Sequence, residues 1–279
     1  MTVGDALELA RRTLGSASRR EADELYAAVV CGTASSAFLD RDQPLAAAVG
    51  ERLMLAAERH AAGWPQQYAT GRANFRGHWL AVDQRVLIPR PETEGLVELI
   101  VEASKRRSVE APIVADIGTG SGAIAIALAL EANVSGVIAT DISADALNVA
   151  LENAARLGAK ERIGFRRGSF LEPLLDDRVD IVVSNPPYIA TAEWEALEAS
   201  VRDYEPRLAL DGGADGMGPY RAIVGQSVAA LNPGGLLALE VDERRASQTA
   251  ALATAAGFRD VEVKNDLAGR ARYMVAYRP

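Results

Sequence analysis

IVADIGTGSG, residues 113–122, is the stretch that decides the fold class of this chain. Its apolar beginning predicts a buried strand, and the residues that follow, Ala123–Leu130, predict a helix. Glycines between a strand and a helix let a ligand approach the backbone closely, and the first turn of the helix offers that ligand unpaired N–H groups. The stretch therefore predicts a strand, a ligand-binding turn and a helix of an α/β domain.

An acidic residue follows at a spacing typical of nucleoside binding. Asp141 ends the next apolar run, residues 137–140, and lies 19 residues after Gly122. An acidic side chain at that point can bind the hydroxyl groups of a ribose. The pattern Gly118-x-Gly120-x-x-Ala123 also fits the dinucleotide fingerprint, so the glycines alone leave a nicotinamide enzyme as an alternative.

Residues 185–188, Asn-Pro-Pro-Tyr, favour a different ligand. They directly follow the apolar run 181–184, which predicts another buried strand. The two prolines cannot continue a strand ladder because neither has a backbone N–H, so they stiffen the turn and leave carbonyl oxygens free to accept hydrogen bonds. Asn185 adds a side-chain carbonyl. We call residues 185–188 the ledge; a plain tight turn is the alternative interpretation.

The order of these features points to one cofactor. The glycine turn, Asp141 and the ledge each follow the carboxyl end of a predicted strand, and in an open α/β sheet those ends share one crevice. An acceptor-rich ledge beside an aromatic ring suits a planar group that carries –NH2. The combination therefore predicts a nucleoside-bearing cofactor next to a bound –NH2 group, with S-adenosylmethionine as the natural candidate.

Strands and helices alternate from residue 111 onward, which predicts a parallel, Rossmann-like sheet covered on both faces. The predicted strands are 113–116, 137–141, 163–167, 180–184 and 236–241, and the predicted helices are 121–132, 143–157, 219–231 and 243–256. Two further strands, 261–264 and 272–277, have no helix between them, so one of them should be antiparallel.

The N-terminal part has a different character. Residues 1–73 predict a small helical bundle with helices at 3–14, 19–31 and 45–62, and Ser18 fits a capping box for the second helix. Residues 74–88 predict a β-hairpin linker, and 89–279 the catalytic domain. That domain should open with a helix from Pro91 through Arg107, because proline and acidic residues favour a first turn.

Composition limits the function classes. The 279 residues carry a net charge of −8, whereas a generic nucleic-acid-binding surface is strongly basic. A single cysteine, Cys31, and two histidines, His60 and His78, predict no intrachain disulfide and no metal site. The N-terminus lacks the apolar core of a signal peptide, and no apolar run approaches the roughly 20 residues of a membrane span, so we expect a cytoplasmic protein without membrane contact.

Five separated segments resemble the HemK/PrmC family of protein-(glutamine-N5) methyltransferases, which modify class I peptide-chain release factors. The matching segments are Leu87–Glu94, Asp116–Gly122, Ser184–Ile189, Tyr204–Gly213 and Asp266–Arg270. Two positions depart from the family pattern. Ser169 stands where an acidic residue is usual, and Asp242 stands where glycine is usual.

The resemblance implies a class I S-adenosylmethionine-dependent methyltransferase domain with a seven-stranded sheet, an N-terminal helical domain for substrate recognition and a hairpin linker. It implies that the methionine part of S-adenosylmethionine binds at the glycine turn, the ribose at Asp141 and the adenine near Phe170. The glycine-turn residues are Gly118, Thr119, Gly120, Ser121 and Gly122. The ledge, Asn185, Pro186, Pro187 and Tyr188, would hold the glutamine of a release factor's Gly-Gly-Gln loop, and Asn185 would also contact the cofactor.

The implied reaction is methyl transfer to the glutamine amide nitrogen, with S-adenosylhomocysteine as product. The catalytic residues would be Asn185, Pro186 and Tyr188: the Asn185 side-chain carbonyl and the Pro186 backbone carbonyl accept the two amide protons, and Tyr188 packs against the carboxamide or walls the pocket. Two other substrates stay open at this point: glutamine on a ribosomal protein, and an exocyclic amine of a nucleic acid. We expect a monomer that needs no metal and makes no direct nucleic-acid contact.

Overall fold

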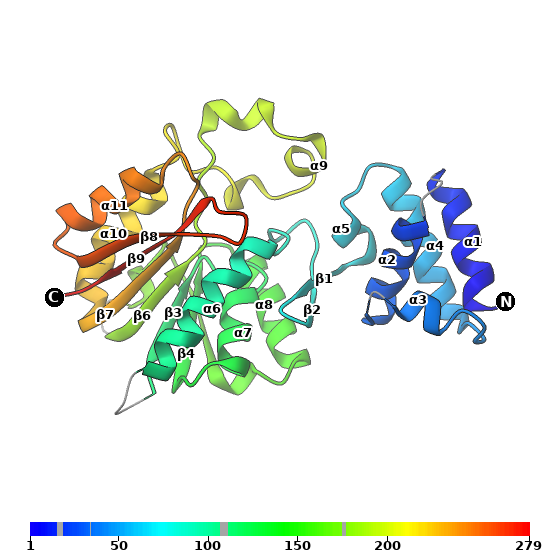
Figure 1. The fold of residues 1–279 in the computed structure, drawn as a ribbon, viewed down its shortest axis with the longest axis horizontal. Helices are drawn as coiled ribbons and strands as arrows, with labels where there is room; N and C mark the ends of the chain where they lie inside the picture. The colour runs from blue at the N-terminus through cyan, green and yellow to red at the C-terminus, as the bar shows by residue number, and fades with distance from the viewer. Residues whose placement is uncertain (16–18, 34, 107–110, 175–176) are drawn as a thin grey trace. The chain divides into compact units, whose positions relative to one another are not determined.

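The computed structural model describes residues 1–15, 19–33, 35–106, 111–174 and 177–279, which pack as two compact units. The first unit comprises residues within 1–84 together with 198–205, and the second comprises 85–197 and 206–279 (Figure 1). The hairpin expected as a linker packs with the first unit. So does the segment 198–205, although it lies within the range 89–279 that was expected to form the catalytic domain.

The first unit is a bundle of short helices. Its helices are α1 (Val3–Leu14), α2 (Arg19–Val30), α3 (Ser36–Leu39), α4 (Ala47–Ala61), α5 (Gln66–Thr70) and α9 (Ala199–Arg202). The three predicted helices are confirmed to within two residues at each end. Helix α1 starts at a reciprocal cap, because Thr2 Oγ1 accepts from the backbone N–H of Asp5 while Asp5 accepts from that of Thr2. Ser18, the predicted cap of α2, lies outside the described residues.

Two short strands complete this unit. β1 (Arg72–Phe75) and β2 (His78–Ala81) pair antiparallel, which confirms the predicted hairpin, although it begins a few residues earlier than expected. The two turn residues, Arg76 and Gly77, both have positive φ, 50° and 79°, as a tight hairpin turn requires.

The second unit is a seven-stranded sheet between two helical layers. Its strands are β3 (Ile113–Ile117), β4 (Gly136–Asp141), β5 (Ile163–Arg167), β6 (Val179–Ser184), β7 (Leu231–Glu240), β8 (Arg259–Asn265) and β9 (Ala271–Tyr277). They are ordered β5-β4-β3-β6-β7-β9-β8, and β9 runs antiparallel to both neighbours, which confirms the expectation for the tail. β7 begins five residues before its predicted start, in a stretch where its pairing with β6 is irregular.

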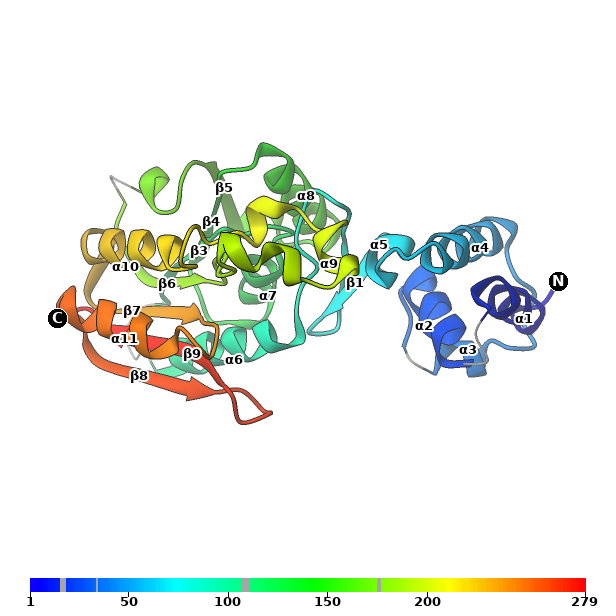
Figure 2. The ribbon, with the colours of Figure 1, turned by 90° about the horizontal axis from the view of Figure 1, so that it is seen from above.

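Helices cover both faces of the sheet. α6 (Pro91–Arg106), α7 (Ala123–Glu131) and α8 (Ala144–Arg156) pack on one face, and α10 (Gly218–Ala230) and α11 (Ala246–Ala255) on the other (Figures 1 and 2). Arg107, the predicted end of α6, lies outside the described residues. No helix in the described part of the chain has the length and apolar character that crossing a membrane requires.

The strand arrangement decides where a ligand can bind. β4, β3, β6 and β7 are parallel neighbours, so their carboxyl ends lie along one edge of the sheet. The order of strands reverses between β3 and β6, the switch point at which open α/β sheets bind ligands. Away from this edge the interior of the sheet is apolar, since Val182, Leu237 and Leu239 are fully buried in one apolar core.

Candidate active site

A cavity of about 270 Å³ opens at the carboxyl ends of the strands, within the second unit. It is mostly apolar, with a few convergent polar groups, as small-molecule sites usually are. Its lining comes from the loop before α6, the glycine turn, the end of β4, the first turn of α8, the loop after β5, the ledge, and the first turn of α10 with the segment that precedes it. The lining residues are Arg85, Val86, Leu87, Gly118, Gly120, Asp141, Ile142, Ser143, Ala146, Ser169, Phe170, Asn185, Pro187, Pro206, Leu208, Ala209, Asp211 and Pro219.

The glycine turn exposes backbone to this cavity. Gly118 and Gly120 have φ of 72° and 55°, and open space lies where a Cβ would stand at either residue. A side chain there would be strained and would fill the space that a ligand needs. Thr119, Ser121 and Gly122 lie behind the lining and hold the turn in shape rather than forming its surface. Gly122, for example, packs so closely against Ala150 that a Cβ would stand 3.1 Å from the Ala150 Cβ.

Asp116 is a buried carboxylate with one unused oxygen. Its Oδ2 accepts hydrogen bonds from Thr119 Oγ1 at 2.7 Å and from the backbone N–H of Ala125 at 3.1 Å. Its Oδ1 is buried and has no hydrogen-bond partner among the described residues. Burial raises the pKa of Asp116 to about 7. An unpartnered buried acceptor beside a ligand turn fits a ligand that brings a cationic or N–H donor, as an amino acid's ammonium group does.

Asp141 and Phe170 form the adjoining wall. Asp141 Oδ2 accepts from the backbone N–H of Gly120 and Oδ1 from that of Ser143, both at 2.9 Å, so this acid also holds the glycine turn. Burial raises the pKa of Asp141 although these hydrogen bonds oppose the rise. Phe170 has an unusual φ of 50°, and its carbonyl accepts from Thr140 Oγ1 at 2.9 Å. That bond holds the strained residue at the cavity.

The structure separates the four residues of the ledge. Asn185 and Pro187 line the cavity, whereas Pro186 is buried and the ring of Tyr188 packs against the core of the sheet. Burial raises the pKa of the Tyr188 hydroxyl, and the nearby Glu240 carboxylate adds to the rise. The expected wall of the pocket is therefore made at this point by Asn185 and Pro187, with Tyr188 behind them.

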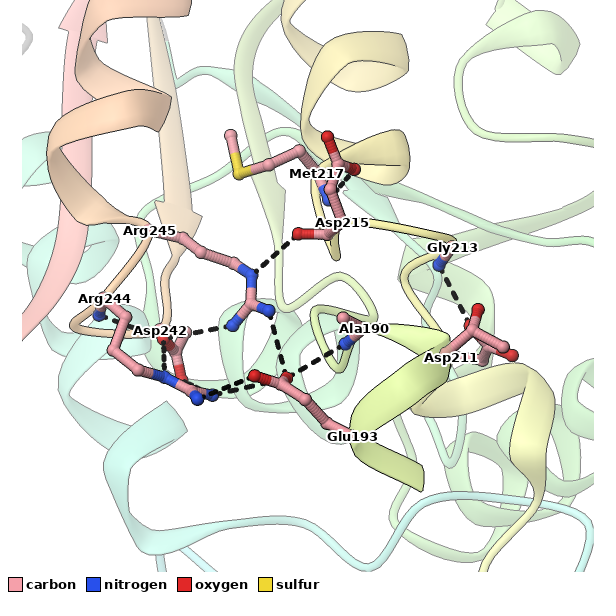
Figure 3. A network of polar contacts seen from close by, with 10 residues as sticks. Ala190, Glu193, Asp211, Gly213, Asp215, Met217, Asp242, Arg244 and Arg245 are labelled. Atoms are coloured by element: carbon pink, nitrogen blue, oxygen red, sulfur yellow. Dashed lines mark hydrogen bonds and ion pairs between the residues drawn. The ribbon is translucent and has the colours of Figure 1, made fainter. Parts of the chain in front are cut away.

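A network of charged side chains holds the loops that flank the ledge (Figure 3). Glu193 accepts from the backbone N–H of Ala190 at 3.1 Å and from Arg245 Nη2 at 3.0 Å. Arg245 also donates from Nε to the Asp215 carbonyl at 3.2 Å, and Asp242 accepts from Arg244 and Arg245. Asp242, one of the two departures from the family pattern, is thus a structural anchor that joins the turn after β7 to the loops around the ledge.

Sequence reasoning assigned no role to several residues that the fold brings to this site. Leu87, Leu208 and Ala209 line the cavity, and Thr93 and Glu240 lie behind Asn185. Leu87, Thr93, Leu208 and Ala209 fall in segments that carry the family resemblance. That resemblance was the only available signal, because no local pattern shows that these segments meet.

Comparisons with known proteins show the family of this chain. Residues 94–214 match the family model "Methyltransferase small domain". A release factor glutamine methyltransferase of Moorella thermoacetica is 44% identical over 96% of this chain and 98% of its own length. One from Chlorobaculum tepidum is 39% identical over 95% of this chain and 94% of its own. The chain belongs to the release factor glutamine methyltransferase family.

A solved methyltransferase structure shows the same fold. The methyltransferase from Pyrococcus furiosus superposes with a TM-score of 0.55 over 73% of this chain and 90% of its own, at 17% sequence identity. The class I methyltransferase fold expected for this family member is therefore confirmed, as is its seven-stranded sheet.

Proposed function

We propose that this family member transfers the methyl group of S-adenosylmethionine to the side-chain amide nitrogen of the glutamine in the Gly-Gly-Gln motif of class I release factors. One observation carries the proposal: the amide of Asn185, the glycine turn and Asp141 line a single cavity. The names of the related proteins support the glutamine as substrate. S-adenosylhomocysteine would be the product.

The residues at the glycine turn fit the methionine end of this cofactor. Gly118 and Gly120 leave room for it, and the unpartnered Oδ1 of Asp116 is an acceptor for its ammonium group. Asp141 would accept from the ribose hydroxyls, and Phe170 would pack beside the adenine, with Asn185 at the reacting end. When bound, the cofactor supplies an electrophilic methyl group on a sulfonium. Thr119, Ser121 and Gly122 would keep the turn in its binding shape.

The ledge would overcome the low reactivity of an amide. The nitrogen lone pair of a carboxamide is delocalised into its carbonyl, the resonance that gives an amide C–N bond its rotational barrier of about 18–20 kcal/mol. Asn185 Oδ1 and the Pro186 carbonyl would accept the two amide protons and so hold the nitrogen with its lone pair aimed along the line of transfer. Positioning of this kind can supply about 7–11 kcal/mol of a barrier. Pro187 would complete the wall, and Tyr188 would support it from behind.

The helical first unit is proposed to contribute to recognition of the release factor. It is expected to act as a separate N-terminal domain, residues 1–73, followed by the linker 74–88 and the catalytic domain 89–279. The protein is expected to work as a cytoplasmic monomer without a metal.

The test uses S-adenosylmethionine with a labelled methyl group and purified unmethylated release factor. A matched release factor, with the glutamine of its Gly-Gly-Gln motif changed to alanine, serves as the control. Label on the first protein and none on the second is the expected result. Label on neither, with S-adenosylhomocysteine binding demonstrated, would overturn the substrate assignment and direct the search to ribosomal proteins and then to nucleic acid.

A further inference from the structure

The carboxamide of Asn185 lies at the cavity and is the first member of a chain of hydrogen bonds that is otherwise buried. Asn185 Nδ2 donates to Thr93 Oγ1 at 3.1 Å, and Thr93 Oγ1 donates to Glu240 Oε2 at 2.7 Å. Asn185 lines the cavity, whereas Thr93 and Glu240 are only 4% and 2% exposed. The chain of contacts therefore runs from the cavity wall into the interior of the second unit.

Three separate elements bring these residues together. β6 and β7 pair so that Ser184 lies opposite Leu239, which places the next residues, Asn185 and Glu240, side by side at the carboxyl ends of the two strands. Thr93 reaches both from the first turn of α6. The two contacts span 92 and 147 residues of sequence.

The number of available protons decides which way the Asn185 carboxamide points. An ionised carboxylate can only accept hydrogen bonds, so Glu240 takes the single hydroxyl proton of Thr93. Thr93 Oγ1 then has only lone pairs left, and only the –NH2 end of Asn185 can face it. The oxygen end, Oδ1, is turned away from Thr93, and no described residue donates a hydrogen bond to it.

We propose that Thr93 and Glu240 are positioning residues, which hold Asn185 Nδ2 so that Oδ1 faces the amide of the substrate. This inference rests on the proposed function, because it assigns to Asn185 the acceptor role in glutamine binding. A free asparagine can turn its amide by half a rotation, and the turned form would meet the substrate's –NH2 group with its own. The chain Glu240–Thr93 excludes that turned form.

The first turn of α6 is itself tied to the sheet, so Thr93 has a determined place. Tyr273, which pairs with Glu240 across β7 and β9, donates its hydroxyl to the Glu92 carbonyl at 2.6 Å. The helix lies so close that a Cβ on Gly95 would stand 2.2 Å from the Tyr273 Oη. The hydrogen bond and the close packing of Tyr273, both from β9, therefore hold the turn that carries Thr93.

The orientation depends on the protonation of Glu240. Burial raises the pKa of Glu240 to about 7, against the hydrogen bond from Thr93 and the charges of Arg272 and Arg90, while Glu92 adds to the rise. Tyr188 also faces this carboxyl group. A protonated Glu240 can donate to Thr93 Oγ1, which frees the hydroxyl of Thr93 to donate to Asn185 Oδ1 and so turns the amide. We therefore expect kcat to rise with pH as Glu240 ionises.

The first experiment compares variants by kinetics at saturating S-adenosylmethionine. Thr93→Val replaces the hydroxyl with a methyl group and should lower kcat by about 10- to 100-fold, by comparison with the loss of groups that orient the ligands of metal sites. Thr93→Ser keeps a hydroxyl and should retain most of the activity. Thr249→Val is the matched control: this buried hydroxyl donates only to the carbonyl of Arg245, the N-cap residue of its own helix, α11. It should leave kcat unchanged. S-adenosylhomocysteine should bind all three variants as it binds the wild type.

The second experiment reads the orientation without any substrate. In protein labelled with ¹⁵N-asparagine, the Asn185 –NH2 signal is identified by its loss in Asn185→Ala. It should exchange slowly with water in the wild type and in Thr93→Ser, and faster in Thr93→Val. Equal exchange in all three would overturn the inference even if the release factor proved not to be the substrate.

The kinetic experiment can also contradict the positioning role. If the wild type methylates the release factor and Thr93→Val does so equally fast, the positioning role is wrong while the proposed function stands. In Glu240→Gln the rise of kcat with pH should disappear, since no group remains at that position to ionise; an unchanged pH profile would also count against the inference. If the wild type does not methylate the glutamine of the Gly-Gly-Gln motif, the proposed function is refuted, whereas the orientation of Asn185 is still tested by the exchange experiment.

Discussion

Two polar clusters meet the carboxyl end of β7, one at Glu240 and the other at Asp242. Their surroundings shift the pKa values of these two carboxyl groups in opposite directions. Glu240 is buried and accepts from the neutral Thr93, and burial raises its pKa to about 7. Asp242 accepts from Arg244 and Arg245, and although burial opposes it, hydrogen bonding to Arg244 keeps the pKa of Asp242 below its ordinary value. Glu193, in the same network, likewise has a lowered pKa.

The difference shows how surroundings assign tasks to similar acidic side chains. A buried carboxyl group without a close counter-ion changes its protonation near neutral pH, so it can alter the hydrogen bonds of its neighbours. A carboxylate that contacts arginines stays ionised and serves as an anchor. The first cluster should therefore respond to pH and the second to salt.

The largest effect on catalysis should come from Asn185, where the buried cluster reaches the cavity. Asn185→Ala removes the proposed acceptor of the substrate amide and should lower kcat by about 100- to 1,000-fold, comparable to the loss of one preorganised hydrogen-bonding group in other enzymes. Binding of S-adenosylhomocysteine, measured by calorimetry, should remain. Turnover close to that of the wild type would remove Asn185 from the mechanism.

Stability should depend on pH through the buried cluster. The pKa of Glu240 is 4.5 when unperturbed and about 7 in the fold, so between these values the folded protein holds a proton that the unfolded chain has lost. The free energy of unfolding should therefore fall as pH rises from about 4.5 to about 7. Urea denaturation at several pH values measures this slope.

Glu240→Gln provides the control for that slope. The variant should show a shallower decline, with the remainder contributed by Asp116, whose pKa is also raised to about 7 by burial. An identical slope in wild type and variant would mean that Glu240 does not titrate in this interval. The Arg-bound Asp242 contributes in the opposite direction, because its stabilisation is present above its unfolded pKa and is lost only as pH falls through its lowered folded value.

A single added methyl group at Gly95 should disrupt the close packing of α6 against β9. Gly95→Ala would place a Cβ 2.2 Å from Tyr273 Oη, which should cost about 1–3 kcal/mol of stability and displace the turn that carries Thr93. Gly225→Ala is the matched control, because no atom lies within 4 Å of a Cβ there in α10. That change should stabilise by about 0.5–1 kcal/mol. Similar thermal unfolding of the two variants would contradict the close contact.

The smallest effect should come from the exposed arginine of the second cluster. The Arg244 side chain is 63% exposed, so Arg244→Ala should cost less than about 1 kcal/mol, and its cost should shrink further in high salt. The Arg245 side chain is 9% exposed and also bonds a backbone carbonyl, so Arg245→Ala should cost more, about 1–3 kcal/mol. Denaturation of both variants at low and high salt tests the order, and equal costs would refute it.

Sequence reasoning predicted the elements well because their signals are local. Apolar runs followed by glycine, aspartate or proline marked the ends of β3, β4 and β6, and hydrophobic spacing marked the helices. The parallel sheet then follows from the alternation of strands and helices. In β7 only the start was predicted wrongly, five residues too late, because this strand begins in a stretch of asparagine, proline and glycine that carries no strand pattern.

The candidate site was predictable only in part. Gly118, Gly120, Asp141, Phe170, Asn185 and Pro187 lie together in the cavity lining, and their roles in binding and transfer stay predictions. Tyr188 was expected to pack against the substrate carboxamide or to wall the pocket. Its ring packs against the core of the sheet and it is not among the residues that line the cavity, so its role stays a prediction. In a turn with two prolines, local sequence patterns do not show which side chains face the cavity and which face the core. The direction of the Tyr188 side chain could therefore not be predicted.

The fold class could be predicted from the sequence alone, and the cofactor class and the acceptor-rich ledge are predictions of the same kind, because each depends on residues that are neighbours in the chain. The way in which Asn185 is held, in contrast, depends on contacts between distant parts of the chain. Thr93 and Glu240 reach it from a helix and a strand that are 92 residues before and 55 residues after it in the chain. The hydrogen bonds that orient its amide exist only once β6 and β7 have paired and α6 has packed on them, since burial then leaves each proton a single acceptor.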